Sequence, residues 1–86
     1  LELIEKSARY AATEAASIGL DWTYAPMVDV ARDPRWGRSV EGAGEDPWWG
    51  AQVAAARVRG FQGKRGLAAP DALMATAKHF AGYGAS

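Results

Sequence analysis

The chain has 86 residues with ten basic and ten acidic side chains, so its formal net charge is zero. This balance disfavours a general nucleic-acid surface, which needs an excess of lysine and arginine, and no apolar run approaches the ~20 residues of a membrane helix. Cysteine is absent, which excludes disulfides and thiolate chemistry. We expect a globular segment with neither nucleic acid nor membrane among its partners.

An amphipathic helix is predicted over about residues 1–18, because apolar residues recur there at spacings of three and four. Gly19 is suited to ending this helix, since glycine readily takes the left-handed conformation. The contact stripe is narrow and rich in alanine, which permits close approach to a neighbouring layer. It consists of Leu1, Ile4, Ala8, Ala11, Ala15 and Ile18.

A short strand is predicted next, over about residues 22–27, where tryptophan, threonine and tyrosine favour extended backbone. Pro26 has no N–H and is expected to end ladder pairing on its side. A loop rich in charge follows over about residues 28–46 and is called the charged loop below. Structureless connections beyond ~12–15 residues are commonly functional, so the length of the charged loop itself suggests a function.

A second helix is predicted to begin after Asp46, whose carboxylate can cap the free N–H groups, with Pro47 in its first turn. Gly60 or Gly63 is expected to end it. An apolar run over about residues 72–80 is predicted as a buried strand. One face of the second helix is expected to hold Trp49, Val53 and Ala56.

The order helix, strand, long loop, helix, strand predicts an α/β fold with parallel strands joined by a right-handed crossover. The carboxyl ends of parallel strands lie at one edge of the sheet, where ligands bind in such folds. Asp29 and the arginines of the charged loop follow the first strand, and Lys78 and His79 close the second. We therefore expect these side chains to share one rim.

The chemistry of this rim suits a polyhydroxylated ligand. Arg38 offers a planar fork that can grip two oxygens, Lys78 offers three donors, and His79 can donate and accept near neutral pH. Trp36, Trp48 or Trp49 could add an aromatic face. A phosphate would suit the same donors, but carboxylates precede the second helix where a phosphate would bind. A neutral sugar is therefore favoured.

Purely structural interpretations stand beside these. Arg32 and Arg35 are expected to form an ion-pair mesh with the carboxylates around them, and the carboxylate of Asp46 is expected to act as a cap. A tryptophan at the start of a helix more often packs than stacks on a ligand. The acidic members of the mesh are expected to be Asp33, Glu41, Glu45 and Asp46.

Two motifs, "APMVDVARDPRWGRSVEGAGEDP" and "TAKHFAGYG", resemble glycoside hydrolase family 3, in its bacterial β-glucosidase and β-xylosidase branch. The resemblance implies part of a (β/α)₈ TIM barrel, a fold of about 250 residues, normally joined to an α/β sandwich domain. Residues 1–86 would then be a partial N-terminal barrel domain, truncated at both ends. The related N-acetylhexosaminidase branch typically reads "KHFPGHG", and the different residues here favour the glucosidase or xylosidase branch.

The resemblance also implies roles for single residues. Arg38, Lys78 and His79 match residues that bind the sugar in the −1 subsite of a retaining, exo-acting enzyme that releases terminal, non-reducing β-D-glucosyl residues. Asp29 falls at a position that varies within the family and is a fourth candidate for substrate binding. The mesh carboxylates Glu41, Glu45 and Asp46 would hold the loop together through Arg32 and Arg35.

The nucleophilic aspartate, in a short "SD" context, and the acid/base would lie outside this chain, so none of its residues is assigned a catalytic role. We expect no cofactor and no metal, an oligosaccharide or β-glucoside as substrate, and a periplasmic or secreted location. The alternatives are a β-xylosidase of the same family, a non-catalytic sugar-binding or structural piece of a barrel, and a phosphate-binding segment.

Overall fold

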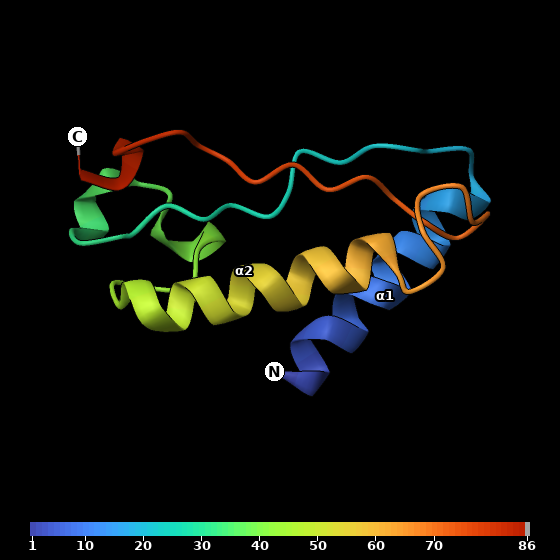
Figure 1. The fold of residues 1–86 in the computed structure, drawn as a ribbon. Helices are drawn as coiled ribbons and strands as arrows, with labels where there is room; N and C mark the ends of the chain where they lie inside the picture. Colours follow the sequence, from blue (N-terminus) through green and yellow to red (C-terminus); the bar gives the residue numbers. More distant parts are fainter. Residues whose placement is uncertain (86) are drawn as a thin grey trace.

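The computed structural model describes residues 1–85 and consists of two long helices that cross, the second of which lies along a pair of extended segments (Figure 1). Short 3₁₀ turns occur between the helices and near the carboxyl end. No helix in the described part of the chain has the length and apolar character needed to cross a membrane. The elements are α1 (Glu2–Ser17), η1 (Pro34–Trp36), η2 (Ser39–Glu41), α2 (Pro47–Gln62) and η3 (Tyr83–Ala85).

Helix α1 ends as its sequence predicts, but its contact face is narrower than expected. Gly19, with φ 93°, follows the last turn in the left-handed conformation. Ala8 and Ala12 are the buried residues of α1, whereas Ala11 and Ile18 are exposed. Residues one turn apart share a face, and Ala11 is rotated by about 100° from Ala12. The predicted stripe was therefore wrong at Ala11 and Ile18, and also at Leu1, which is exposed.

Helices α1 and α2 cross at Gly60, where the side chain of any other residue would meet α1. A Cβ built on Gly60 would contact the carbonyl oxygen of Glu5 and would lie 2.6 Å from the Cβ of Ala8. An interhelical ion pair between Arg59 and Glu5, at 2.9 Å, lies beside the crossing. Small residues on both helices thus set the distance between them.

Helix α2 begins and ends as predicted. Asp46 accepts a hydrogen bond from the backbone N–H of Trp48 at 2.9 Å, Pro47 follows it, and the helix stops at Gly63. The face expected to hold Trp49, Val53 and Ala56 is only partly buried, because Ala56 is fully buried while Trp49 is 38% exposed. The inner face turns instead towards α1 and the second extended segment. The small core joins Ala8, Ala12, Phe61 and Leu73.

The two predicted strands, 22–27 and 72–80, lie side by side and parallel, but within residues 1–85 neither is continuous. Two isolated parallel bridges join them, Trp22 to Met74 and Met27 to Lys78. The first segment thus advances five residues between the bridges while the second advances four. This change of register is that of a β-bulge, which disrupts the ladder locally.

Pro26 does not end the pairing, contrary to expectation. Its carbonyl accepts from the N–H of Lys78 at 3.1 Å, and the N–H of Val28 then donates to the carbonyl of Lys78 at 2.6 Å. Proline has no N–H to donate on that side, and the bulge takes up the gap, since the N–H of Thr76 donates to the carbonyl of Ala25 at 2.8 Å. Pairing therefore continues to Val28 and delivers Asp29 beside His79.

Candidate sugar-binding site

Asp29 and His79 meet where the paired segments end. The Asp29 side chain is 2% exposed, and its Oδ2 lies 2.7 Å from Nδ1 of His79. The same oxygen accepts the backbone N–H of His79 at 3.2 Å. Two nitrogens of a single residue thus contact a buried carboxylate oxygen, which would be costly to remove from water without partners.

Arg38 enters from the charged loop through two tight turns. Asp33 caps η1 by accepting from the N–H of Arg35, and Gly37 ends that turn with φ 95°, a conformation that favours glycine. The next turn places Glu41 against Arg38, whose Nε and NH2 donate to the two carboxylate oxygens at 2.6 and 2.7 Å. This bidentate pair fixes the plane of the guanidinium.

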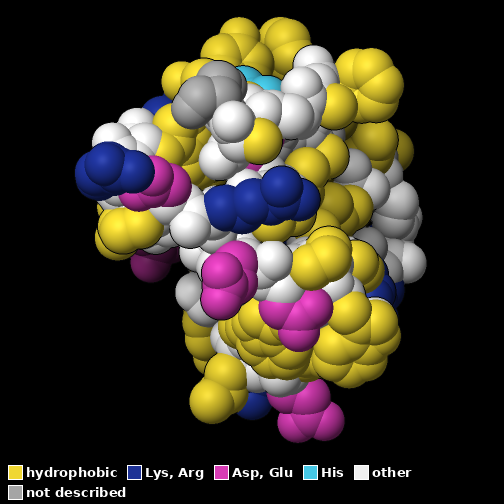
Figure 2. All heavy atoms as spheres, turned by 90° about the vertical axis from the view of Figure 1, so that its left-hand side faces the viewer, with side chains coloured by type: hydrophobic (Ala, Val, Ile, Leu, Met, Phe, Trp, Pro, Cys, Tyr) yellow, Lys and Arg dark blue, Asp and Glu magenta, His cyan; other side chains and the backbone are white. Residues whose placement is uncertain are grey.

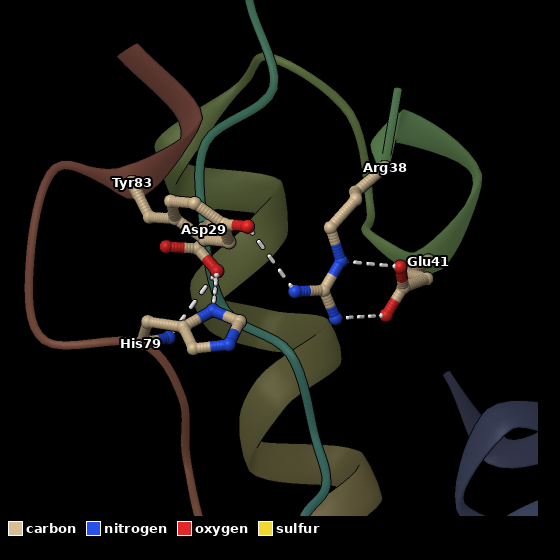
Figure 3. Close-up of polar contacts among 5 residues, drawn as sticks. All are labelled: Asp29, Arg38, Glu41, His79 and Tyr83. Atoms are coloured by element: carbon tan, nitrogen blue, oxygen red, sulfur yellow. Dashed lines mark hydrogen bonds and ion pairs between the residues drawn. The ribbon is translucent and has the colours of Figure 1, made fainter. Parts of the chain in front are cut away.

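Tyr83, in η3, connects Arg38 to His79. Its hydroxyl accepts from NH1 of Arg38 at 3.4 Å, and the guanidinium carbon lies 5.5 Å from its ring centre. The imidazole of His79 meets the same ring edge-on at 4.7 Å, and the indole of Trp36 does so at 5.1 Å. Figure 3 shows the guanidinium between Glu41 on one side and Tyr83 on the other. Sequence reasoning missed Tyr83 as a site residue.

A hollow of about 450 Å³ opens at this cluster and is lined by Arg38, His79 and the segment 80–83. The ring of Phe80 is fully exposed there. Trp48 and Trp49, two of the three rings expected near the ligand, begin α2 and do not line the hollow. The third ring, that of Trp36, contacts the cluster only through its edge-on packing against Tyr83.

The ionised groups near the hollow act on one another. The hydrogen bonds from Arg38 hold the pKa of the Glu41 carboxyl below its ordinary value, and the charge of Lys78 acts in the same direction. The hydrogen bonds to Glu41 and Tyr83 in turn raise the pKa of Arg38 above its ordinary value. Lys78 does not line the hollow itself, but its charge is felt at Glu41, beside Arg38.

The predicted mesh around Arg32 and Arg35 is wrong except for one pair, because within residues 1–85 neither Arg32 nor Glu45 forms an ion pair. Arg35 pairs with Asp33 at 2.7 Å in an exposed position, where such a pair contributes little. Glu41 pairs with Arg38, so it belongs to the hollow and not to the mesh. Asp46 caps α2, as the structural interpretation predicted. Glu41 pairs with Arg38 because the two residues are three positions apart, and a 3₁₀ helix has three residues per turn, so their side chains lie on the same side.

The end of the molecule that carries these turns mixes charges of both signs with hydrophobic side chains (Figure 2). Both carboxylates of the cluster have a nitrogen-bearing partner: Asp29 contacts the ring of His79, and Glu41 pairs with Arg38. The arrangement offers a nearly balanced set of donors and acceptors next to aromatic rings. Such a set suits a neutral, polyhydroxylated ligand better than a phosphate.

Comparison with known proteins identifies the family. Residues 1–86 match the description "Glycosyl hydrolase family 3 N terminal domain". The chain is 47% identical over 85 residues to a periplasmic beta-glucosidase of Salmonella typhimurium, covering 99% of this chain and 11% of that protein. It is 42% identical over 84 residues to a beta-xylosidase of Formosa agariphila, covering 95% and 12%. The chain thus spans about a tenth of the length of these relatives.

A solved beta-glucosidase of Listeria innocua superposes with a TM-score of 0.90 at 40% identity, covering 99% of this chain and 12% of that one. The chain therefore belongs to glycosyl hydrolase family 3, within its N-terminal domain. That domain is a TIM barrel, and the chain folds as a piece of it. The order of helices and parallel segments predicted from the sequence is confirmed at this level.

Proposed function

We propose that this chain is part of the barrel domain of a retaining, exo-acting β-glucosidase-like glycoside hydrolase that hydrolyses terminal, non-reducing β-D-glucosyl residues. In this proposal Arg38, Lys78 and His79 bind the sugar of the −1 subsite. The observation that carries it is the hollow in which Arg38 and His79, from distant parts of the sequence, are joined through Tyr83. The solved Listeria enzyme has been captured in complex with glucose.

The hydrogen-bonding capacity of the hollow matches a pyranose. A guanidinium has five N–H donors, and the bonds to Glu41 and Tyr83 use three of those on Arg38. The remaining donors, on NH1 and NH2, are available to sugar oxygens. Bonds of this kind that tighten as the oxocarbenium ion develops would be the contribution of this segment to the rate.

The two catalytic carboxyls come from outside this chain in our proposal. Retaining glycosidases place a nucleophile and an acid/base on either side of the bond that is cleaved. Asp29 is buried against His79 and Glu41 is held by Arg38, so neither is available for those roles. The remaining strands of the barrel and an α/β sandwich domain would supply them. A periplasmic or secreted location is proposed by analogy with the Salmonella relative.

The proposed function is tested by assaying the full-length protein on a panel of nitrophenyl glycosides. We expect the β-glucoside to be hydrolysed with the highest kcat/KM and the product to keep the β configuration. A higher kcat/KM on the β-xyloside would instead make the protein a β-xylosidase, an alternative favoured by the Formosa relative. Binding of glucose without turnover of any glycoside would establish a sugar-binding barrel. Competition by inorganic phosphate would favour a phosphate site.

The Glu41→Gln variant tests whether the Arg38–Glu41 pair shapes the sugar site. We expect KM to rise about two- to fivefold, because an amide accepts less strongly than a carboxylate and releases the guanidinium from its plane. Asp33→Asn is the matched control, since it neutralises the exposed partner of Arg35 but keeps a good helix cap. An equal rise of KM in both variants would contradict a specific role for Glu41.

The same pair predicts how binding responds to acid. A carboxyl whose pKa is lowered in the folded protein keeps its stabilising contact until the pH falls through that lowered value. The pKa of Glu41 lies below its ordinary 4.5, so the part of KM that depends on this pair is expected to stay constant from pH 7 to pH 5. The difference in KM between the wild type and Glu41→Gln, measured across this range, checks it.

A further inference from the structure

We infer that Asp29 is a positioning residue that holds His79 with its proton on Nδ1, so that Nε2 accepts a hydrogen bond from a substrate hydroxyl. This inference rests on the proposed function and deepens it. It assigns a direction to each hydrogen bond that the three residues of the proposed function make with the sugar: Arg38 and Lys78 donate, and His79 accepts. It also gives Asp29 a role different from direct contact with the sugar.

The proton on Nδ1 follows from the partner of that nitrogen. Oδ2 of Asp29 receives the backbone N–H of His79 at 3.2 Å, and a backbone N–H can only donate. The oxygen is therefore an acceptor, and the contact with Nδ1 at 2.7 Å needs a proton on the ring nitrogen. In neutral imidazole a proton on Nδ1 leaves Nε2 as an acceptor.

The ring plane is fixed as well as the tautomer. The Tyr83 ring meets the imidazole edge-on, with 76° between the planes, on the side of the Arg38 guanidinium. Figure 3 shows the ring edge opposite Nδ1 turned away from Asp29 and towards the space beside the Arg38 guanidinium. Nε2 therefore faces the hollow while the buried carboxylate of Asp29 is withdrawn from it.

This arrangement has a chemical consequence for the substrate. A sugar hydroxyl can donate one hydrogen bond and accept others, so a site with a mixture of donors and one neutral acceptor can orient it fully. The hydroxyl that meets His79 must donate to Nε2, while hydroxyls that meet Arg38 or Lys78 must accept. A site built to pair with a hydroxyl proton strongly disfavours an analogue that lacks it.

The tautomer is measured directly in the full-length protein with ¹⁵N-labelled histidine. His79 is identified by the resonances that disappear in His79→Gln or shift in Asp29→Asn. We expect an Nδ1–H, Nε2-unprotonated signature at pH 7 in the wild type. A proton on Nε2, in either the other tautomer or the imidazolium, would overturn the inference. This readout does not depend on activity, so failure of the proposed function on the glycoside panel leaves it intact.

Variants of Asp29 supply the kinetic test. Asp29→Ala removes the acceptor and is expected to lower kcat/KM about 10- to 100-fold, the scale of a lost charge-assisted bond. Asp29→Asn keeps an oxygen that can accept from Nδ1–H, so we expect it to restore both the tautomer and most of the activity. Glu14→Ala, which removes an exposed carboxylate on α1, is the control and should leave kcat/KM unchanged. Equal losses in Asp29→Asn and Asp29→Ala would overturn the inference.

Substrate analogues reveal the direction of the hydrogen bond when the wild type is compared with Asp29→Ala. Aryl β-glucosides with one hydroxyl replaced by hydrogen or by fluorine are compared position by position. The hydroxyl that contacts His79 is the one whose removal is non-additive with Asp29→Ala. At that position fluorine, which can accept but cannot donate, is expected to be as harmful as hydrogen. Good turnover of the fluoro analogue there would show that His79 donates.

Discussion

Replacing Arg38 by alanine in the full-length protein is expected to lower kcat/KM on an aryl β-glucoside about 30-fold or more. The loss reflects charge-assisted hydrogen bonds from the free N–H groups of the guanidinium to the sugar, which strengthen in the transition state. The change also leaves Glu41 and the hydroxyl of Tyr83 without their arginine partner. Steady-state kinetics on the nitrophenyl glucoside measure the effect.

The Arg38→Lys variant tests the planar, bidentate geometry of the guanidinium separately from its positive charge. Lysine keeps the positive charge but cannot pair with Glu41 through two parallel bonds, so we expect a loss intermediate between wild type and Arg38→Ala. Lys78→Ala should cost about as much as Arg38→Ala, because it removes another charged donor from the proposed site. Lys64→Ala, an exposed lysine beyond α2, is the control. Near-normal turnover by Arg38→Ala or Lys78→Ala would refute the assignment of these residues to the −1 subsite.

The sequence was sufficient to predict where the helices lie, because their ends carry strong local signals. Asp46 and Pro47 specify the start of α2, and Gly19 and Gly63 specify the two ends. The strands were less predictable. Their residues favour extended backbone, but an uninterrupted ladder also requires a constant register, and the register shifts by one residue around Pro26. Such a bulge depends on a partner segment some fifty residues away, which local propensity does not describe.

The candidate site was predictable in part for a related reason. The rule that parallel strands end at one edge brings Asp29 and His79 together from opposite halves of the chain, and the structure places them 2.7 Å apart. The rule does not tell which residue contacts which. Tyr83 lies beyond the edge, in η3, and no pattern in a single sequence distinguishes a tyrosine that joins an arginine to a histidine from one that covers a core.

The partner of Glu41 is determined by the local backbone geometry and could not be predicted from the composition of the charged loop. The charged loop holds three arginines and several carboxylates, so composition alone allows many pairs. Gly37 ends one 3₁₀ turn, Arg38 precedes the next, and this second turn sets Glu41 directly beside Arg38. A glutamate three positions after an arginine that follows a glycine would have been the signal to use.

The crossing of the two helices yields the largest expected effect on stability. Gly60→Ala is expected to lower the free energy of unfolding by about 1–3 kcal/mol, the usual cost of overpacking. The new methyl group would collide with the backbone of Glu5 and the side chain of Ala8, and neither can move without separating α1 from α2. Intrinsic propensity alone predicts the opposite sign, since alanine favours a helix over glycine by about 1 kcal/mol.

Gly50→Ala in the same helix is the matched control for this collision. A Cβ at Gly50 meets nothing within 4 Å, so the same substitution should be neutral or stabilise the protein by up to about 1 kcal/mol. Denaturant unfolding of the full-length protein, followed by a signal from the barrel domain, gives both values. Because the two variants share one helix and one chemical change, helix propensity cancels in their difference and only the contact with α1 remains. If Gly60→Ala were as stable as Gly50→Ala, the close crossing of α1 and α2 would not determine stability at this position.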